Sequence, residues 1–393
     1  MKKNILLVAV LALLASCNSG TKKDSDFGTL ESLIENGPAV FNLSQKLPER
    51  EIVLQDVAEV SYIPLETTDE VLLAQYRTLA SMTDELILIN NGRGEVITFD
   101  VDGKIVAQFN NTGGSGQEYT RTSQICLDNE AKVLYIADDD NARIQVYTLE
   151  GKYLRTIRQP YKLTTAYLAK MGDKLLINES YQFIDAAKDT LIQPYMLLNI
   201  NDGSTSRLNI NVTDPNPIII KQGAFTISFM YDGNAKYGDG YMFFDNSIDT
   251  VYYLSGNMEL SPILTLSPSM ASASFFLSTP YVCDHYLFTR QIAKSVDIPD
   301  DLSRLRIKTE DLVYDFATGD YFPYKIVNKD YSGKGFSINV QQTPKNTLTF
   351  FLEAGDILDA YDEGKLSGPL KELASTLDAD DNPVLMVVKF HEK

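Results

Sequence analysis

The sequence predicts an all-β fold, a six-bladed β-propeller that is closed by an N-terminal strand and carries a short helical insertion in its last blade. The first observation is a repeat, because residues 86–109 match residues 134–157 without a gap at a constant offset of 48 residues. A fixed period of this length with several strands in it is typical of propellers. The other two observations are a series of turn glycines and one unmatched strand near the N-terminus.

The turn glycines mark one blade after another along the chain. They stand at positions 103, 151, 203, 256 and 319, so the step between them grows from 48 to 63 residues. Glycine suits these tight turns because it adopts φ > 0 without strain. The growing step indicates that the loops lengthen while the strands keep their length.

Apolar and alternating segments predict the strands of each blade in order. For the first three blades they are 72–80, 86–90, 96–100 and 104–109, then 121–127, 133–138, 143–148 and 152–157, then 163–170, 174–179, 195–200 and 205–210. For the next two blades they are 223–230, 241–245, 250–254 and 258–266, then 276–282, 285–292, 312–316 and 321–327. The last blade has 335–341, 347–352 and 384–390, with a helical pair around 357–361 and 370–377, and it lacks a fourth strand.

Residues 51–63 are the expected donor of that missing strand. They read as strand segments, end at Pro64 and precede the first blade. A ring that is closed by the chain's own beginning removes the exposed sheet edges that invite aggregation. Five and seven blades are the competing counts.

The N-terminus has the pattern of a lipoprotein signal peptide. Lys2 and Lys3 precede an apolar run at 5–14, which is too short to span a bilayer as a helix. The sequence Leu-Ala-Ser-Cys at 14–17 resembles a bacterial lipobox, which implies cleavage before Cys17 and lipid attachment to it. We therefore expect a signal peptide at 1–16, a tether and connector at 17–48 and the propeller at 49–393. The expected location is the cell envelope, at the outer membrane, with the periplasmic and surface sides both open.

The composition excludes some classes of partner. The formal net charge is −18, whereas nucleic acids are bound by clusters of Lys and Arg. We therefore expect no nucleic-acid partner, and contact with the membrane only through the N-terminal lipid. There is no His or Cys set with metal-ligand spacing, so we expect no metal site and no cofactor. Cys126 and Cys283 fall on blades that face each other across the ring, so we expect two free, buried thiols.

Two resemblances follow from particular motifs. The segment 135–147 (YIADDDNARIQVY), followed by Gly151 and Lys152, resembles an NHL repeat. The mature chain more closely resembles the six-bladed β-propeller lipoproteins of Bacteroidota, through 62–67 (YIPLET), 113–119 (GGSGQEY) and 381–384 (DNPV). This resemblance implies the fold and the envelope location, and it implies no reaction.

Residues 138–141 (DDDN) have two interpretations. Their oxygen atoms could bind Ca²⁺, but the twelve-residue loop that ends in Glu is missing. The favoured interpretation is a turn in which Asp and Asn bind their own backbone, with an Asp138 to Arg143 bond inside the blade. The two histidines, His285 and His391, lie in no nucleophile motif, so no catalytic residue is nominated.

The lengths of the loops point to one face of the ring. Connections after the first and third strands of each blade are mostly tight, whereas those after the second and fourth strands are long. Loops on a rigid scaffold often carry function. The long-loop face is therefore the candidate binding surface, with these residues near the channel mouth: Glu118, Tyr119, Arg121, Tyr161, Tyr181 and Arg290.

Two functions remain open from the sequence. The first is a non-catalytic binding module on an envelope lipoprotein, whose ligand is a peptide, a glycan or a partner protein. The alternative is a propeller-type hydrolase or lyase that acts on glycans or lactones at the channel mouth. Inward-facing acids, histidines or arginines with perturbed pKa values at one end of the channel would favour the enzyme, and an apolar, plugged channel would exclude it.

Overall fold

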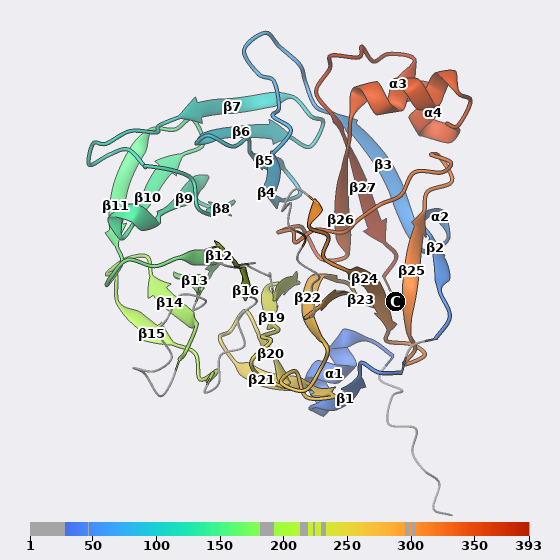
Figure 1. The fold of residues 1–393 in the computed structure, drawn as a ribbon. Helices are drawn as coiled ribbons and strands as arrows, with labels where there is room; N and C mark the ends of the chain where they lie inside the picture. Colours follow the sequence, from blue (N-terminus) through green and yellow to red (C-terminus); the bar gives the residue numbers. More distant parts are fainter. Residues whose placement is uncertain are drawn as a thin grey trace, which may run out of the picture.

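The chain forms a six-bladed β-propeller, and Figure 1 shows the blades arranged around the central channel. The computed structural model describes residues 28–45, 47–180, 192–212, 219–222, 225–228, 233–294, 299 and 304–392. Six antiparallel sheets surround a central channel, and a separate two-stranded hairpin lies outside them. The predicted fold class and blade count are confirmed, and the expected signal peptide at 1–16 lies outside the described residues.

The first three blades are four-stranded sheets in sequential order. Blade one holds β4 (Thr78–Met82), β5 (Leu86–Asn90), β6 (Glu95–Asp100) and β7 (Ile105–Asn110). Blade two holds β8 (Ile125–Asp128), β9 (Val133–Asp138), β10 (Arg143–Thr148) and β11 (Tyr153–Arg158). Blade three holds β12 (Thr165–Met171), β13 (Lys174–Glu179), β14 (Tyr195–Asn199) and β15 (Thr205–Arg207).

Blades four and five each gain a fifth, outermost strand from the N-terminal region. Blade four holds β18 (Asn234–Tyr237), β19 (Gly240–Phe243), β20 (Thr250–Leu254) and β21 (Leu260–Ser267), and β1 (Ala39–Asn42) pairs in parallel with β21. Blade five holds β22 (Phe275–Val282), β23 (Tyr286–Ala293), β24 (Thr309–Asp315) and β25 (Tyr321–Val327), and β2 (Arg50–Val53) pairs in parallel with β25. Neither parallel pairing was expected, and β1 lies in the segment assigned to the connector.

Blade six is closed by the N-terminal strand, as predicted. It holds β26 (Thr347–Leu352), β27 (Val384–Phe390) and β3 (Ala58–Pro64), and β3 pairs antiparallel with β27 over its whole length. The short helix α2 (Leu54–Val57) separates β2 from β3. The segment 51–63 therefore does not form one strand, because its first part joins blade five and only its second part closes blade six.

The prediction that 335–341 form the first strand of blade six is wrong. This segment pairs with none of the strands that the structure describes, and it leads into a crossing of the channel at Gln342. The Gln342 carbonyl accepts the Met82 N–H of blade one at 2.8 Å, and its Nε2 donates to the Leu168 carbonyl of blade three at 2.8 Å. We call residues 335–342 the channel strap. These cross-ring contacts replace the pairing with β26 that the periodicity predicted.

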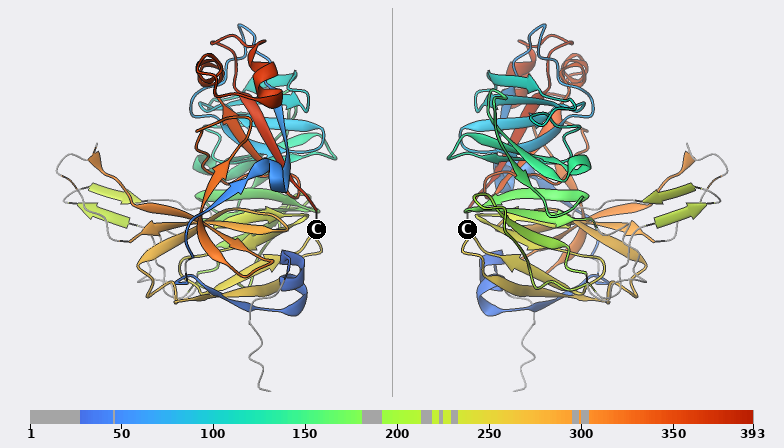
Figure 2. Two further views of the ribbon diagram at one scale, coloured as in Figure 1. Left: turned by 90° about the vertical axis from the view of Figure 1, so that its right-hand side faces the viewer. Right: turned by 90° about the vertical axis from the view of Figure 1, so that its left-hand side faces the viewer.

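The prediction that 223–230 form the first strand of blade four is also wrong. Its described part, β17 (Phe225–Ser228), pairs with β16 (Ile219–Gln222) in the separate hairpin. The inner strand is β18, whose Tyr237 pairs with Gly240 across a tight turn at Gly238, where φ is +59°. Figure 2 shows this hairpin and the ends of the blade-five strands projecting together from one side of the ring.

Three further helices are present, and two of them match the helical pair expected in the last blade. Helix α1 (Leu30–Asn36) begins at Thr29, whose Oγ1 accepts the Ser32 N–H, and it buries Leu30 and Leu33 against blade four. Helices α3 (Ala354–Asp362) and α4 (Gly368–Ala374) form the insertion in blade six, visible at the rim in Figure 1. No helix in the described part of the chain has the length and apolar character needed to cross a bilayer.

The apolar core lies between neighbouring blades. For example, one cluster joins blades two and three, and another joins the first blade to the last. Cys126 and Cys283 are both buried and free, as predicted, and burial raises the pKa of each thiol to about 12. A thiol with such a pKa stays protonated at neutral pH and is a poor nucleophile.

A polar cluster fastens three blades and α1 together on the face opposite the long loops. The Asp284 carboxylate accepts hydrogen bonds from Tyr237 Oη and, at 2.8 Å, from Asn346 Nδ2. Lys345 Nζ lies 3.0 Å from the Asp284 carboxylate and 2.6 Å from that of Glu31. Burial raises the pKa of Asp284, but the hydrogen bonds outweigh it and leave the pKa below its ordinary value of 3.8.

Asp284→Asn is expected to destabilise the protein by about 2 kcal/mol at pH 7, because the cluster loses its charge-assisted hydrogen bonds. The pKa of Asp284 is lower in the folded protein than its ordinary value of 3.8. Its contribution to the free energy of unfolding is therefore fully present above pH 3.8, and it is lost as the pH falls through the lower folded-state pKa. Urea unfolding of wild type and variant should therefore converge in acid. The matched control Asp102→Asn, at an exposed turn, should change the free energy of unfolding little. If wild type and Asp284→Asn differ by the same free energy at every pH, the stabilising role of the Asp284 carboxylate is contradicted.

Candidate functional site

A cavity of about 570 Å³ opens between blades one, five and six. Its lining comes from the start of β4, from β22 and β23, from the channel strap and from the end of β26. The lining residues are Arg77, Thr78, Leu79, Ser278, Arg290, Lys334, Gly335, Phe336, Ser337, Ile338, Asn339, Val340, Gln341, Thr349, Phe350, Phe351 and Leu352. Its volume falls in the ordinary range of ligand pockets, about 300–1,000 Å³.

The cavity lies on the long-loop face that the sequence singles out. Thr78 begins β4, the first strand of its blade, and Leu352 ends β26, which occupies the second position of its blade. In an up-down blade, the first strand begins on the same face on which the second strand ends. The cavity and the long connections therefore share one face.

A second hollow of about 290 Å³ continues from the first toward blades two and three. The two hollows share Thr78, Leu79, Val340 and Gln341 as lining residues. The channel strap thus lies between them and divides the channel mouth. Val340 also packs against the apolar cluster of blades three and four, which holds the strap in place.

Three cationic side chains line the larger cavity, and they come from three parts of the ring. Arg290 Nε lies 2.5 Å from one Asp311 oxygen, and its Nη2 lies 3.1 Å from the other. Lys334 Nζ lies 2.8 Å from Asp356. Both of these cations therefore have a carboxylate partner that does not itself line the cavity.

Arg77 is the most buried of the three cations. It forms an ion pair with Glu353, donates from Nη1 to the Ala74 carbonyl at 3.0 Å, and stacks its guanidinium 4.7 Å from the centre of the Phe351 ring. Its side chain is only 4% exposed, and its buried Nε has no hydrogen-bond partner within the described residues. A buried donor without a partner costs about 1–3 kcal/mol.

The charge of the cavity is stable at neutral pH. The hydrogen bond to Asp311 raises the pKa of Arg290 above its ordinary value. Burial lowers the pKa of Lys334, but the hydrogen bond to Asp356 outweighs it, so the pKa is raised overall. None of the described residues that line this cavity is Asp, Glu, His, Tyr or Cys. The arrangement supplies positive charge and hydrogen-bond donors beside an apolar wall that includes Phe336 and Phe350.

Of the six residues nominated from the sequence, Arg290 lines this cavity. Glu118 and Tyr119 belong instead to the connection between blades one and two. Tyr119 is fully buried, donates from its hydroxyl to the Gly94 carbonyl at 2.5 Å and accepts the Asn111 N–H at 3.0 Å. The Glu118 carboxylate accepts the Ser115 N–H at 2.8 Å, which lowers its pKa. A buried side chain cannot contribute to a binding surface, so Tyr119 is corrected to a structural residue.

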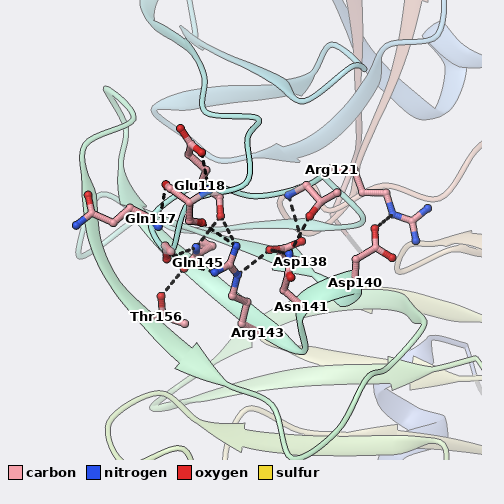
Figure 3. A network of polar contacts seen from close by, with 12 residues as sticks. Gln117, Glu118, Arg121, Asp138, Asp140, Asn141, Arg143, Gln145 and Thr156 are labelled. Atoms are coloured by element: carbon pink, nitrogen blue, oxygen red, sulfur yellow. Dashed lines mark hydrogen bonds and ion pairs between the residues drawn. The ribbon is translucent and has the colours of Figure 1, made fainter.

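Figure 3 shows how blade two holds that connection. Arg143 lies 2.7 Å from Asp138 and donates to the carbonyls of Ser115, Gly116 and Glu118. Gln145 Nε2 donates to two of the same carbonyls, and Thr156 donates to Gln145 Oε1. The Asp138–Arg143 bond inside the blade is confirmed. The turn's side chains do not bind their own backbone as expected, because they bind Thr120 and Thr165 instead. Among the described residues, no acidic or His/Cys cluster is arranged to hold a metal ion.

The other nominated residues lie apart from the cavity. Arg121 is exposed and lies 3.4 Å from Asp140 (Figure 3). Tyr161 is exposed at the edge of blade three, where its hydroxyl donates to Glu179 at 3.0 Å and contacts Arg207. Tyr181 lies outside the described residues. The sequence reasoning therefore found one cavity residue and missed Arg77, Lys334 and Phe351.

These observations define the class of the protein, a six-bladed β-propeller with a cation-lined cavity on its long-loop face. The chain belongs to the family described as "Domain of unknown function (DUF4934)", whose model matches residues 38–389. The match includes β1 and ends inside β27, so it spans the ring and its closing strands. No sequence in the curated set matches the chain.

Solved structures support the fold. A Bacteroides fragilis protein described as exported is 16% identical, with a TM-score of 0.59, and the likeness covers 90% of this chain and all of that one. A member of the DUF4221 family from Bacteroides vulgatus is 10% identical with a TM-score of 0.49, over 86% and 98% of the two chains. Virginiamycin B lyase from Staphylococcus aureus is 7% identical with a TM-score of 0.39, over 84% and 99%. The last two likenesses are too distant to support a conclusion.

Tyr119→Phe is expected to destabilise the protein by about 1–2 kcal/mol, because the Gly94 carbonyl and the Asn111 N–H lose their buried partner. The same substitution at exposed Tyr161 should change the unfolding free energy by less than about 0.5 kcal/mol. Urea unfolding checks both variants. Equal effects at the two positions would contradict the structural role of Tyr119.

Proposed function

We propose that this chain is an envelope-anchored lipoprotein whose propeller is a non-catalytic binding module for an anionic ligand. The observation that carries the binding proposal is the larger cavity, in which Arg77, Arg290 and Lys334 line the wall while their carboxylate partners do not. The charged groups that line this cavity are all cationic, although the formal net charge of the chain is −18. A carboxylate, sulfate or phosphate would gain charge-assisted hydrogen bonds there.

The ligand would bind to N–H groups of Arg290 and Lys334 that their ion pairs do not use. Within the described residues, Arg290 uses Nε and Nη2 toward Asp311 and Ser337, which leaves Nη1. Lys334 has one hydrogen bond to Asp356, which leaves two of its three N–H groups. The ion pairs hold these cations in position before a ligand arrives, so little side-chain entropy is lost on binding.

The anchoring part of the proposal comes from the sequence. The lipobox resemblance at 14–17 implies a diacylglyceryl group and an N-acyl chain on Cys17, and two or more chains hold a protein stably on a bilayer. The segment between Cys17 and α1 would serve as the tether. We propose the outer membrane as the location.

The alternative, a hydrolase or lyase, has less support from the cavity. Acid–base catalysis needs a group that titrates near the working pH within reach of the substrate. The described lining offers arginine and lysine, both charged at neutral pH, and neither a carboxylate nor an imidazole. The binding module is therefore the function that this geometry supports best.

Cys17→Ala is expected to move the protein from the membrane pellet to the soluble fraction, because the lipid has no other attachment site in the lipobox. Fractionation of native cells, with intact mass measurement of the purified protein, checks this. Asn18→Ala in the tether should leave the protein in the pellet. A wild-type protein without added lipid mass would contradict the anchor and leave the binding proposal standing.

Arg290→Gln is expected to weaken binding of an anionic ligand by about ten-fold or more, because a charge-assisted hydrogen bond contributes about 1.5–3 kcal/mol. The probes are tetragalacturonate, a sulfated oligosaccharide and pooled acidic pentapeptides, each beside its neutral counterpart, in calorimetric titrations. Arg50→Gln is the matched control, since Arg50 also pairs with an aspartate, Asp320, and lies outside the cavity.

Binding should weaken as salt rises, because the interaction is between charges. Glycans recovered after incubation should be chemically unchanged. If every anionic probe binds no better than its neutral counterpart, the anionic binding proposal fails. If a glycan is recovered cleaved, the enzyme alternative replaces it.

A further inference from the structure

Blade six exposes a sheet edge toward the channel. Its strand order is β26, β27 and β3, so β26 is the innermost strand, and no described strand pairs with it on its channel side. In the other blades that inner position is occupied by a strand, such as β4 or β22. The channel strap vacates this position, because it crosses to Leu168 of blade three.

Most of this edge is satisfied by the chain itself. Thr347 donates its N–H to the Pro344 carbonyl at 3.1 Å, and its own carbonyl accepts Thr343 Oγ1 at 2.5 Å. At Thr349 the side-chain amide of Gln341 takes the place of a peptide group. It donates from Nε2 to the Thr349 carbonyl at 2.6 Å and accepts the Thr349 N–H at 2.9 Å.

Phe351 is the next edge position, and it is open. Backbone groups along a strand alternate in direction, so Phe351 faces the same side as Thr347 and Thr349, away from β27. Thr347 and Thr349 have hydrogen bonds at this edge. Within the described part of the chain, the Phe351 N–H and carbonyl have none. Phe351 also lines the cation-lined cavity, so the open edge and the charges share one space.

We propose that the ligand is an extended acidic peptide, which adds a short strand to β26 at Phe351 and places a carboxylate against Arg290. This inference rests on the proposed binding function and names its ligand class. A peptide is the occupant that fits an open edge, since its own N–H and carbonyl repeat at the spacing that a strand requires. A glycan would use the cations but has no reason to pair with the Phe351 backbone.

The cavity offers a place for each part of such a peptide. Arg77 stacks on Phe351 and fixes this ring beside the edge. Phe336 and Phe350 pack edge to face at 5.1 Å and supply an apolar wall for a peptide side chain. Arg290 and Lys334 supply the charge that an Asp or Glu side chain would meet. Backbone pairing gives affinity here, and the cations give the preference for acidic sequences.

The test uses the full chain in detergent and two pools of capped pentapeptides, identical except for a central Asp or a central Asn, with the other positions randomised. We expect the Asp pool to be enriched on the protein by about ten-fold over the Asn pool, the value of one charge-assisted hydrogen bond. Arg290→Gln and Lys334→Gln should each reduce this enrichment, and Arg50→Gln should not.

The second readout is amide hydrogen exchange by NMR on protein labelled with ¹⁵N-phenylalanine, measured with the enriched peptides. The Phe351 amide should exchange fast in the free protein and at least about ten-fold more slowly in the complex, since a new hydrogen bond protects it. Phe350 is the internal control, because its backbone pairs with Met386 of β27 with or without ligand.

The outcomes separate the two proposals. If tetragalacturonate binds with Arg290 dependence while neither peptide pool is retained, the peptide inference is overturned and the anionic binding function stands. If the Asp pool is enriched but the Phe351 amide is unprotected, the strand addition is overturned. If no anionic probe binds, both the proposed function and this inference fail.

Discussion

The pairing of β3 with β27 is the interaction on which the rest of the ring depends. A single blade cannot bury both its faces, so each needs a neighbour on either side, and the first and last blades meet only if the chain's ends join. Residues 58–64 make this junction as β3, which pairs antiparallel with blade six. The preceding strand β2 adds a second attachment, because it pairs in parallel with blade five. Ile63 then packs with Leu385 of blade six and Ile87 of blade one in one apolar cluster, so the closing strand also supplies the core of the last interface.

The repeat explains how much of this could be predicted. Four of the turn glycines, at 103, 151, 203 and 319, adopt positive φ, which glycine does without strain. At two of them neighbouring blades also approach closely, since a Cβ on Gly103 would lie 2.2 Å from the Pro64 carbonyl and one on Gly151 would meet the Phe109 ring. The parallel strands β1 and β2 left no such signal, because each is four residues long and has no counterpart in the repeat. The channel strap escaped prediction for a different reason. Its apolar residues fit a strand, but cross-ring contacts of Gln342 and the side-chain pairing of Gln341 decide its course.

The site residues show the same difference: contacts between residues close in sequence could be predicted, and contacts between distant residues could not. Glu118 and Tyr119 lie in a Gly-rich loop, and their polar atoms hold that loop in place. The Glu118 carboxylate binds within the loop, the Tyr119 hydroxyl binds Gly94 of blade one, and the Glu118 carbonyl binds Arg143 of blade two. The signal for Arg143 was correct because its partner, Asp138, lies five residues away in the same hairpin. Arg77 and Lys334 gave no signal, since they precede strands or strap segments that are far apart in sequence and meet only in the closed ring.

The ion pairs explain how an acidic chain keeps a cation-lined cavity. Asp356 is more than half exposed and Lys334 is partly exposed, so their pair adds little stability. Glu353 is likewise more than half exposed, but its partner Arg77 is buried. Such pairs fix the position of a cation without using all of its donors. Among the residues that the structure describes, the buried Nε of Arg77 in addition has no partner, which costs about 1–3 kcal/mol. The open backbone at Phe351 lies in the same cavity, so two kinds of unused hydrogen-bonding capacity, one charged and one peptide-like, converge on one space. A ligand that satisfies both must carry negative charge and an extended backbone together, which a short acidic peptide does and a simple anion does not.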